Sequence, residues 1–147
     1  MIPEWKDVQA YAGTLKTRSL VFKPDHPEQL SEILDYAKKN NLTICPRGNG
    51  YSYADTILNN GHIILDTAKL NRILHWDEFK GSITVEPGVR FADIFNIALA
   101  SNWTLNACPG GMNVTIGGAV SNNVHGKDSW RVGNFGDQVK KINKKAR

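Results

Sequence analysis

The sequence predicts an α+β fold in which a small, partly parallel α/β subdomain precedes a second mixed or antiparallel β subdomain with helices. Three observations predict it. Residues 20–45 follow a strand–helix–strand pattern. Residues 62–85 hold three short apolar runs separated by turn residues. A second amphipathic helix and a long glycine-rich stretch come after them.

The first subdomain is predicted from its helix signals. Residues 20–22 form a short strand, and Asp25 is a candidate N-cap, with Pro27 in the first turn and Glu28 at a capping-box spacing. Apolar residues then recur at helical intervals, at Leu30, Ile33, Leu34 and Ala37. The helix ends at Asn40–Asn41, and residues 42–45 form a buried strand. The two strands joined by a helix are expected to be parallel.

The second subdomain begins with strands at residues 62–65, 72–76 and 82–85. The polar turn at residues 77–81 predicts that the last two strands form a hairpin. The helix after them carries one apolar face, formed by Phe91, Ile94, Phe95, Ala98 and Leu99. From residue 106 to 136 glycine and asparagine are dense and clear periodicity disappears.

Length, composition and charge exclude several classes of protein. The 147 residues, 41% hydrophobic and 22% charged, fit one globular domain, with neither a membrane span nor a signal peptide. A cytoplasmic location is therefore expected. Five cations in the last eight residues account for the net charge of +4, so a solvated basic tail is favoured over a nucleic-acid-binding arm.

Cysteine and histidine spacing gives no metal site. Cys45 and Cys108 form no C-x-x-C motif and are expected to be small buried residues. The histidines lack metal-ligand spacing. They are His26, His62, His75 and His125.

A first glycine-rich stretch, P-R-G-N-G-Y-S-Y-A-D at residues 46–55, directly follows a predicted strand. Successive N–H groups of such a loop can form a concave anion site suited to a pyrophosphate, to which Ser52 can add a hydroxyl. Arg47 either supplies charge or braces the loop. The stretch is neither a Rossmann fingerprint, because Tyr53 stands where the third glycine belongs, nor a P-loop. A glycine-rich turn without a ligand remains an alternative.

A second stretch, P-G-G-M-N-V-T-I-G-G-A-V-S-N-N-V-H-G-K at residues 109–127, is followed by G-N-F-G at residues 133–136. So many small residues suit a backbone that wraps closely around a large flat ligand. The alternative is a floppy loop, which is disfavoured because the segment has apolar residues that could anchor it to a core. These are Val114, Ile116, Ala119, Val120 and Val124.

The two stretches in this order resemble the vanillyl-alcohol-oxidase-type (PCMH-type) FAD-binding domain, and within it decaprenylphosphoryl-β-D-ribose oxidases and related FAD-linked sugar or polyol oxidoreductases. The resemblance covers residues 20–139. It implies that the first loop holds the FAD pyrophosphate, through Arg47, Gly48, Asn49, Gly50, Tyr51 and Ser52. It implies further cofactor contacts at Gly110, Thr115, Gly117, Gly118, Asn122, Asn123, His125, Gly126, Lys127, Gly133, Asn134, Phe135 and Gly136.

The resemblance also suggests two catalytic hypotheses and one chemical difference. Lys127 would stabilise negative charge on the reduced flavin, or else contact a substrate phosphate or lie free on the surface. His125 would be a general base or simply a hydrogen-bonding group. Relatives that bond FAD covalently carry histidine where Tyr51 stands, so FAD is expected to be non-covalent.

The expected activity is FAD-dependent oxidation of an alcohol carbon in a small-molecule sugar, polyol or sugar-lipid substrate. The chain, residues 1–147, is expected to be one FAD-binding domain that is incomplete at its C-terminus and lacks the substrate domain, which a partner chain would then supply. Two alternatives stay open. They are a truncated, non-catalytic dinucleotide-binding module and a reductase of cell-wall precursors with the same cofactor fold. Neither nucleic acid nor a membrane span is expected.

Overall fold

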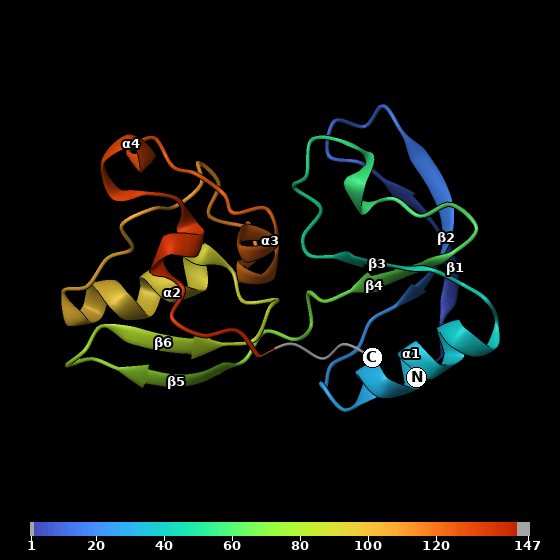
Figure 1. Ribbon diagram of the computed structural model, residues 1–147, viewed down its shortest axis with the longest axis horizontal. Helices are drawn as coiled ribbons and strands as arrows, with labels where there is room; N and C mark the ends of the chain where they lie inside the picture. Colours follow the sequence, from blue (N-terminus) through green and yellow to red (C-terminus); the bar gives the residue numbers. More distant parts are fainter. Residues whose placement is uncertain (1, 144–147) are drawn as a thin grey trace. The chain divides into compact units, whose positions relative to one another are not determined.

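The computed structural model describes residues 2–143, and the chain divides into two compact units, Met1–Leu70 and Asn71–Arg147 (Figure 1). Each unit has its own sheet and helices, which confirms the predicted α+β class with two small sheets. Of the predicted basic tail, Lys140 and Lys141 are exposed, whereas Lys144, Lys145 and Arg147 lie outside the described residues.

The first unit, Met1–Leu70, is a four-stranded sheet in the order β1-β2-β4-β3. The strands β2 (Lys16–Phe22), β4 (Ile63–Asp66) and β3 (Ile44–Arg47) are parallel, and β1 (Glu4–Gln9) pairs antiparallel with β2 at the edge. The predicted parallel relation of the first two strands is confirmed. The strand at residues 62–65 was expected to begin the second subdomain, but as β4 it lies between β2 and β3 and completes the first sheet, because it pairs with both of them. The strand β1 was not predicted, because its only apolar residues are Trp5 and Val8 among charged and polar ones.

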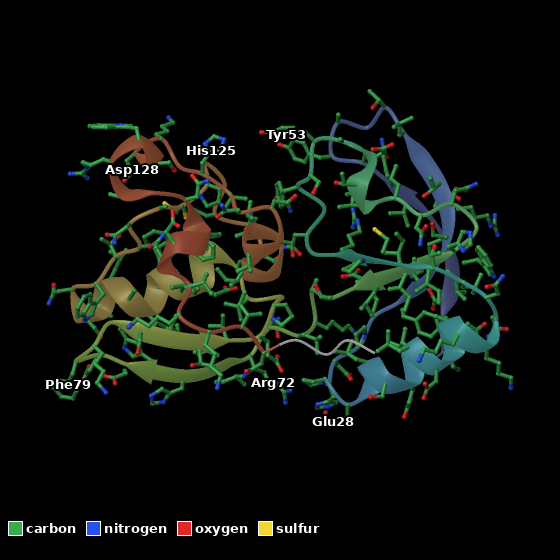
Figure 2. All side chains as sticks on the ribbon, in the orientation of Figure 1. Glu28, Tyr53, Arg72, Phe79, His125 and Asp128 are labelled. Atoms are coloured by element: carbon green, nitrogen blue, oxygen red, sulfur yellow. The ribbon has the colours of Figure 1, made fainter. Side chains whose placement is uncertain are left out.

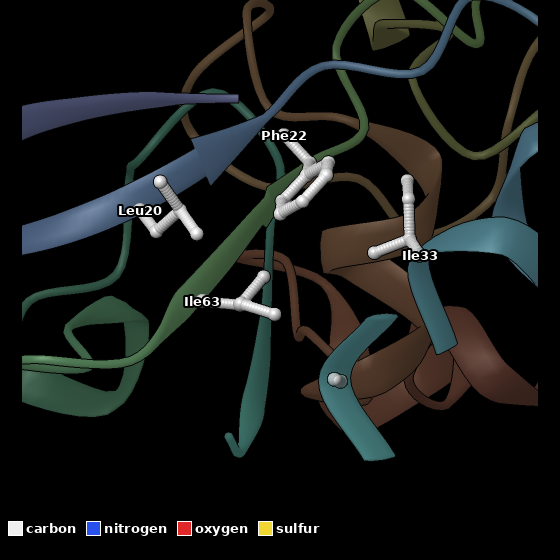
Figure 3. Close-up of a cluster of buried hydrophobic side chains, with 5 residues drawn as sticks. Leu20, Phe22, Ile33 and Ile63 are labelled. Carbon is white, nitrogen blue, oxygen red and sulfur yellow. The ribbon is translucent and has the colours of Figure 1, made fainter. Parts of the chain in front are cut away.

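The helix α1 (Gln29–Lys39) packs its apolar side on one face of this sheet (Figures 1 and 3). The core there consists of Leu20, Phe22, Ile33, Ala37 and Ile63. A second cluster on the sheet joins Val8, Val21 and Ile64, with Cys45 and Leu58 beside them. Ile63 and Ile64 point into different clusters because successive side chains of a strand face opposite sides.

The start of α1 differs from its prediction. Asp25 does not cap the helix, which begins at Gln29 after Glu28. The Gln29 side chain instead turns back, and its Oε1 accepts hydrogen bonds from the backbone N–H groups of Asp25 (2.9 Å) and His26 (3.2 Å). The predicted end is confirmed, because Asn40 is the C-cap and Asn41 adopts a positive φ of 52°.

The second unit, Asn71–Arg147, contains the predicted hairpin and helix. The strands β5 (Ile73–Asp77) and β6 (Ser82–Val85) pair antiparallel, and α2 (Phe91–Ala98) and the short 3₁₀ turn η2 (Leu99–Ser101) follow. One core cluster lies between hairpin and helix, formed by Val89, Ile94 and Ala98. The base of the hairpin is joined by an ion pair between the exposed Arg72 and the buried Glu86, in which Arg72 Nη2 lies 2.6 Å from Glu86 Oε1.

The glycine-rich end of the chain is more regular than its composition indicates. It forms α3 (Ile116–Ser121), α4 (Ser129–Val132) and the 3₁₀ turn η3 (Phe135–Gln138). A second core cluster in this unit joins Phe91, Ala119 and Phe135, and the apolar residues predicted as anchors pack against it. These are Val114, Ile116, Val120 and Val124. The segment is therefore anchored by its own apolar side chains rather than held by a ligand alone.

Candidate functional site

The first glycine loop, residues 48–54, begins at the carboxyl end of β3 and leads into the 3₁₀ turn η1 (Asp55–Ile57). Gly50 is buried and has a φ of +77°, a conformation that side chains with a Cβ disfavour. A Cβ at this position would also lie 2.7 Å from the guanidinium carbon of Arg47. The positive φ therefore favours glycine at position 50, and a larger residue would also displace the Arg47 guanidinium.

Arg47 lies against the inside of this loop. Its Nη2 donates to the Gln9 carbonyl over 3.4 Å, while its buried Nε makes no hydrogen bond within the described residues. Of the two roles that the sequence left open, bracing the loop is the one that these contacts support. The same position also keeps a positive charge beside the loop backbone, where an anionic ligand would be stabilised.

Four backbone donors of the loop are unengaged. The N–H groups of Gly48, Gly50, Tyr51 and Ser52 make no hydrogen bond with any residue in the described range 2–143. Asn49 does interact with the remainder of the chain. Free N–H groups in a tight loop, next to an arginine, can form an anion site, so these residues fit a pyrophosphate.

The second glycine segment, residues 109–136, is different, because several of its glycines are needed by the fold itself. A Cβ on Gly117 would lie 2.7 Å from Pro87 Cβ, and the Gly117 N–H donates to the Pro87 carbonyl over 2.8 Å. A Cβ on Gly126 would lie 2.7 Å from the Cys108 carbonyl. A Cβ on Gly136 would lie 2.5 Å from Asn123 Oδ1. These glycines let neighbouring stretches of chain approach one another.

Polar residues of this segment also serve the fold. Thr115 is buried and caps α3, its Oγ1 accepting from the Gly118 N–H over 3.3 Å. Asn122 Nδ2 donates to the Gly118 carbonyl over 2.9 Å, and Asn123 Oδ1 accepts from the Gly136 N–H at the same distance. These groups were expected from the resemblance to contact the cofactor, and the structure shows each with an internal partner.

The G-N-F-G segment is likewise held internally. Gly133 has a φ of +79°, and the Asn134 N–H donates to Asp137 Oδ2 over 2.7 Å. Phe135 is 6% exposed and packs edge-on against Phe91 at a ring-centroid distance of 5.1 Å. The Phe135 side chain is therefore a core group.

In two places of the second segment, no contact within the fold explains the residues that stand there. Gly110 is exposed, and a Cβ there would meet nothing within 4 Å. The N–H groups of Gly110, Gly111 and Met112 make no hydrogen bond with any described residue. This bare backbone is the part of the segment that a cofactor could approach.

The other place is the turn between α3 and α4, which holds His125 and Lys127 (Figure 2). Both side chains are exposed, and within residues 2–143 neither forms a hydrogen bond or an ion pair. The turn itself is fixed, because the Gly126 N–H donates to Ser129 Oγ over 2.7 Å. Two unengaged basic groups thus stand on an ordered backbone.

The cysteines do not form a reactive site. Cys45 packs beside Val8 and Ile64, and Cys108 packs beside Phe91. Burial raises the pKa of both thiols, so both are protonated at neutral pH and are poor nucleophiles. Across the described part of the chain no group of His, Cys, Asp or Glu can hold a metal ion. Every helix among residues 2–143 is too short or too polar to cross a lipid bilayer.

Comparison with known families settles the ancestry of the chain. The family model described as an FAD binding domain matches residues 19–143, which include both glycine segments. The chain belongs to this family. The predicted resemblance is confirmed, and so is FAD as the cofactor of the family.

Curated relatives of this FAD-binding domain are oxidases and dehydrogenases. The decaprenylphosphoryl-β-D-ribose oxidase of Mycolicibacterium smegmatis is 29% identical over 93% of the chain and 30% of its own length. The L-gulonolactone oxidase of Bos taurus is 29% identical over 72% of the chain and 24% of its own length. The chain thus spans under a third of these relatives.

Solved structures confirm the fold of the FAD-binding domain. Cholesterol oxidase from B. sterolicum matches 84% of the chain with a TM-score of 0.73 at 20% identity, over 24% of its own length. An alkyldihydroxyacetonephosphate synthase matches 85% of the chain with a TM-score of 0.71 at 21% identity, over 26% of its own length.

Proposed function

We propose that this chain binds FAD non-covalently and forms the flavin-binding part of an oxidoreductase that oxidises a CH–OH group of a sugar, polyol or sugar-lipid. The observation that carries the proposal is the set of free N–H groups at Gly48, Gly50, Tyr51 and Ser52 beside the Arg47 guanidinium. The names of the two curated relatives above point to sugar-derived substrates.

The first loop would hold the diphosphate of the cofactor. Backbone N–H groups donate to phosphate oxygens without needing a side chain to be ordered, which keeps the entropic cost of binding low. The Arg47 charge adds to the attraction for the anion, because its guanidinium is already packed beside Gly50.

Bound FAD supplies the hydride-accepting chemistry of this reaction. Lys127 would place a positive charge near the flavin edge that becomes negative on reduction, and so would favour the reduced form. His125 would either accept the hydroxyl proton of the alcohol or orient it by a hydrogen bond. Both side chains are exposed and unengaged in the described structure, as such roles require.

Non-covalent binding follows from Tyr51. The resemblance places this tyrosine where covalently flavinylated relatives have a histidine, and a phenol cannot form the histidyl linkage. Acid precipitation of the FAD-loaded protein is expected to release all of the yellow colour. A yellow pellet would contradict non-covalent binding without touching the proposed FAD site.

A second candidate function is an FAD-binding module that turns over substrate only with another polypeptide. It is favoured by the polar groups of the second segment, since Thr115, Asn122 and Asn123 all have internal partners and leave few side chains for a substrate. Flavin absorbance without bleaching by an added alcohol substrate would support it. Flavin reduction by NADPH would instead point to reductase chemistry.

The test of the proposed function is the visible spectrum and flavin fluorescence of the purified chain during titration with FAD. Saturable binding is expected. Arg47→Gln should weaken FAD affinity by about tenfold, because a charge-assisted contact is lost. Arg18→Gln removes the same charge from an exposed position of β2 and should leave affinity unchanged. Absence of binding to the wild-type chain would contradict the proposal.

A further inference from the structure

The turn between β1 and β2, residues 10–15, is an ordered element of the first unit. The Ala10 N–H donates to the Leu15 carbonyl over 3.1 Å, and the Gly13 N–H donates to the Ala10 carbonyl over 3.0 Å. The Gln9 side chain closes the turn from outside, its Nε2 donating to the Gly13 carbonyl over 2.9 Å. Tyr11 is thus carried by a fixed backbone.

From this turn Tyr11 reaches the first glycine loop at two points. Its ring centroid lies 5.4 Å from that of Tyr51 and 5.5 Å from that of Tyr53, the second pair meeting edge-on at 89°. Both separations lie in the range of favourable aromatic pairs. A third connection runs through the backbone next to Tyr11, because Arg47 Nη2 donates to the Gln9 carbonyl.

These aromatic contacts are not part of the hydrophobic core. Tyr11 is 54% exposed, Tyr51 38% and Tyr53 82%, and Tyr53 projects from the loop that follows β3 (Figure 2). The Tyr11 hydroxyl makes no hydrogen bond to a described residue. The contact between the turn and the loop therefore depends on the rings, and its removal leaves the core of the first unit intact.

We propose that Tyr11 is a positioning residue that holds the first glycine loop in the conformation that binds the cofactor phosphates. The N–H groups of Gly48, Gly50, Tyr51 and Ser52 have no hydrogen bonds to described residues that would fix them, so contacts of the loop's side chains take on that role. The rings of Tyr51 and Tyr53 lie within the loop itself, and Tyr11 fixes both from a separate element. This inference rests on the proposed FAD-binding function for the identity of the ligand.

The test uses three variants of the 147-residue chain. Tyr11→Ala removes both ring contacts, and Tyr11→Phe keeps them while it removes the hydroxyl. Tyr36→Ala is the matched control, because Tyr36 is also partly exposed, at 38%, and makes one edge-on contact, with Phe22 at 5.3 Å, away from the loop. Two quantities are measured. They are the ¹⁵N order parameters of residues 48–53 without ligand and the dissociation constant for FAD.

In Tyr11→Ala we expect the loop order parameters to fall below about 0.6, the range of flexible backbone. We expect FAD to bind about tenfold more weakly, because two aromatic contacts no longer preorganise the loop. Tyr11→Phe should restore both quantities, and Tyr36→Ala should change neither. Unchanged order parameters in Tyr11→Ala, or equal losses in Tyr11→Ala and Tyr36→Ala, would overturn the inference. If the wild-type chain binds no FAD but the loop order parameters still fall in Tyr11→Ala, the proposed ligand is refuted and the positioning role of Tyr11 is supported.

Discussion

The two glycine-rich segments look alike in sequence but are built differently. In the first loop the N–H groups of Gly48, Gly50, Tyr51 and Ser52 have no partner in the described chain, and an arginine lies beside them. In the second segment, other parts of the chain lie so close to Gly117, Gly126 and Gly136 that an added Cβ atom would overlap them. A run of glycines can thus expose backbone to a ligand or allow backbone to pack, and composition alone does not distinguish the two cases.

The largest expected effect contrasts two glycines of the second segment. Gly117→Ala should lower the free energy of unfolding by about 2 kcal/mol or more, because the new methyl group would overlap Pro87. Gly110→Ala should change stability by under about 0.5 kcal/mol, because the position faces open space. Urea unfolding followed by circular dichroism measures both. Equal losses in the two variants would remove the distinction between packing and exposed glycines.

The next effect separates backbone strain from the role of the first loop. Gly50 and Gly61 have nearly the same positive φ, +77° and +74°, but only Gly50 lies against a side chain. Both alanine variants should lose about 1 kcal/mol of stability from the left-handed backbone. Gly50→Ala should in addition displace Arg47 and weaken FAD binding. Unaltered FAD affinity in Gly50→Ala would show that the loop does not bind the cofactor.

A smaller effect tests the turn between α3 and α4. Lys127→Ala should lower the reduction potential of bound flavin by about 30 mV, equivalent to about 1.4 kcal/mol for a two-electron couple, because a nearby cation favours the reduced, more negative flavin. Lys80→Ala, which removes an exposed lysine of the β5–β6 turn, is the control. Equal potentials in wild type and Lys127→Ala would remove the proposed electrostatic role of Lys127.

The smallest effect concerns stability against pH at the start of α2. The hydrogen bond from Arg90 lowers the pKa of Asp93 below the ordinary 3.8. A carboxylate whose pKa is lower in the folded than in the unfolded state stabilises the fold at any pH above the unfolded pKa. This contribution is therefore complete at neutral pH. It disappears as the pH falls from about 3.8 through the native value. In Asp93→Asn the free energy of unfolding should be lower by about 0.5 kcal/mol at pH 7, as expected for a partly exposed pair. It should also fall less than that of the wild type as the pH is lowered, as measured by urea unfolding at several pH values.

The sequence predicted those parts of the fold that follow from local periodicity. The parallel strands, the hairpin and both longer helices were correct, because Ile33 and Ala37 or Ile94 and Ala98 recur on one face at helical spacing. The strand β1 and the start of α1 were not predicted. The first is an edge strand fixed by pairing with β2, and the second depends on the Gln29 side chain, so both are decided by contacts rather than by pattern.

The ligand contacts of the candidate site stay a prediction from the sequence, and the structure adds the internal contacts of its residues. The motif at residues 46–55 indicated a phosphate-binding loop, and the structure supplies the free N–H groups that such a loop needs. The internal roles of Thr115, Asn123 and Phe135 could not be predicted, because each depends on a neighbour that the fold brings close. Tyr11 was missed for the same reason, since 40 residues separate it from Tyr51 along the chain.

The central claim is that backbone N–H groups of the first loop hold the phosphates of FAD. Its most direct test is an FAD titration of the ¹⁵N-labelled chain followed by amide chemical shifts. The account predicts that the resonances of Gly48, Gly50, Tyr51 and Ser52 move with a common saturation curve. Free riboflavin, which lacks phosphates, should leave them in place. Saturable FAD binding in which these four amides do not move would contradict the account.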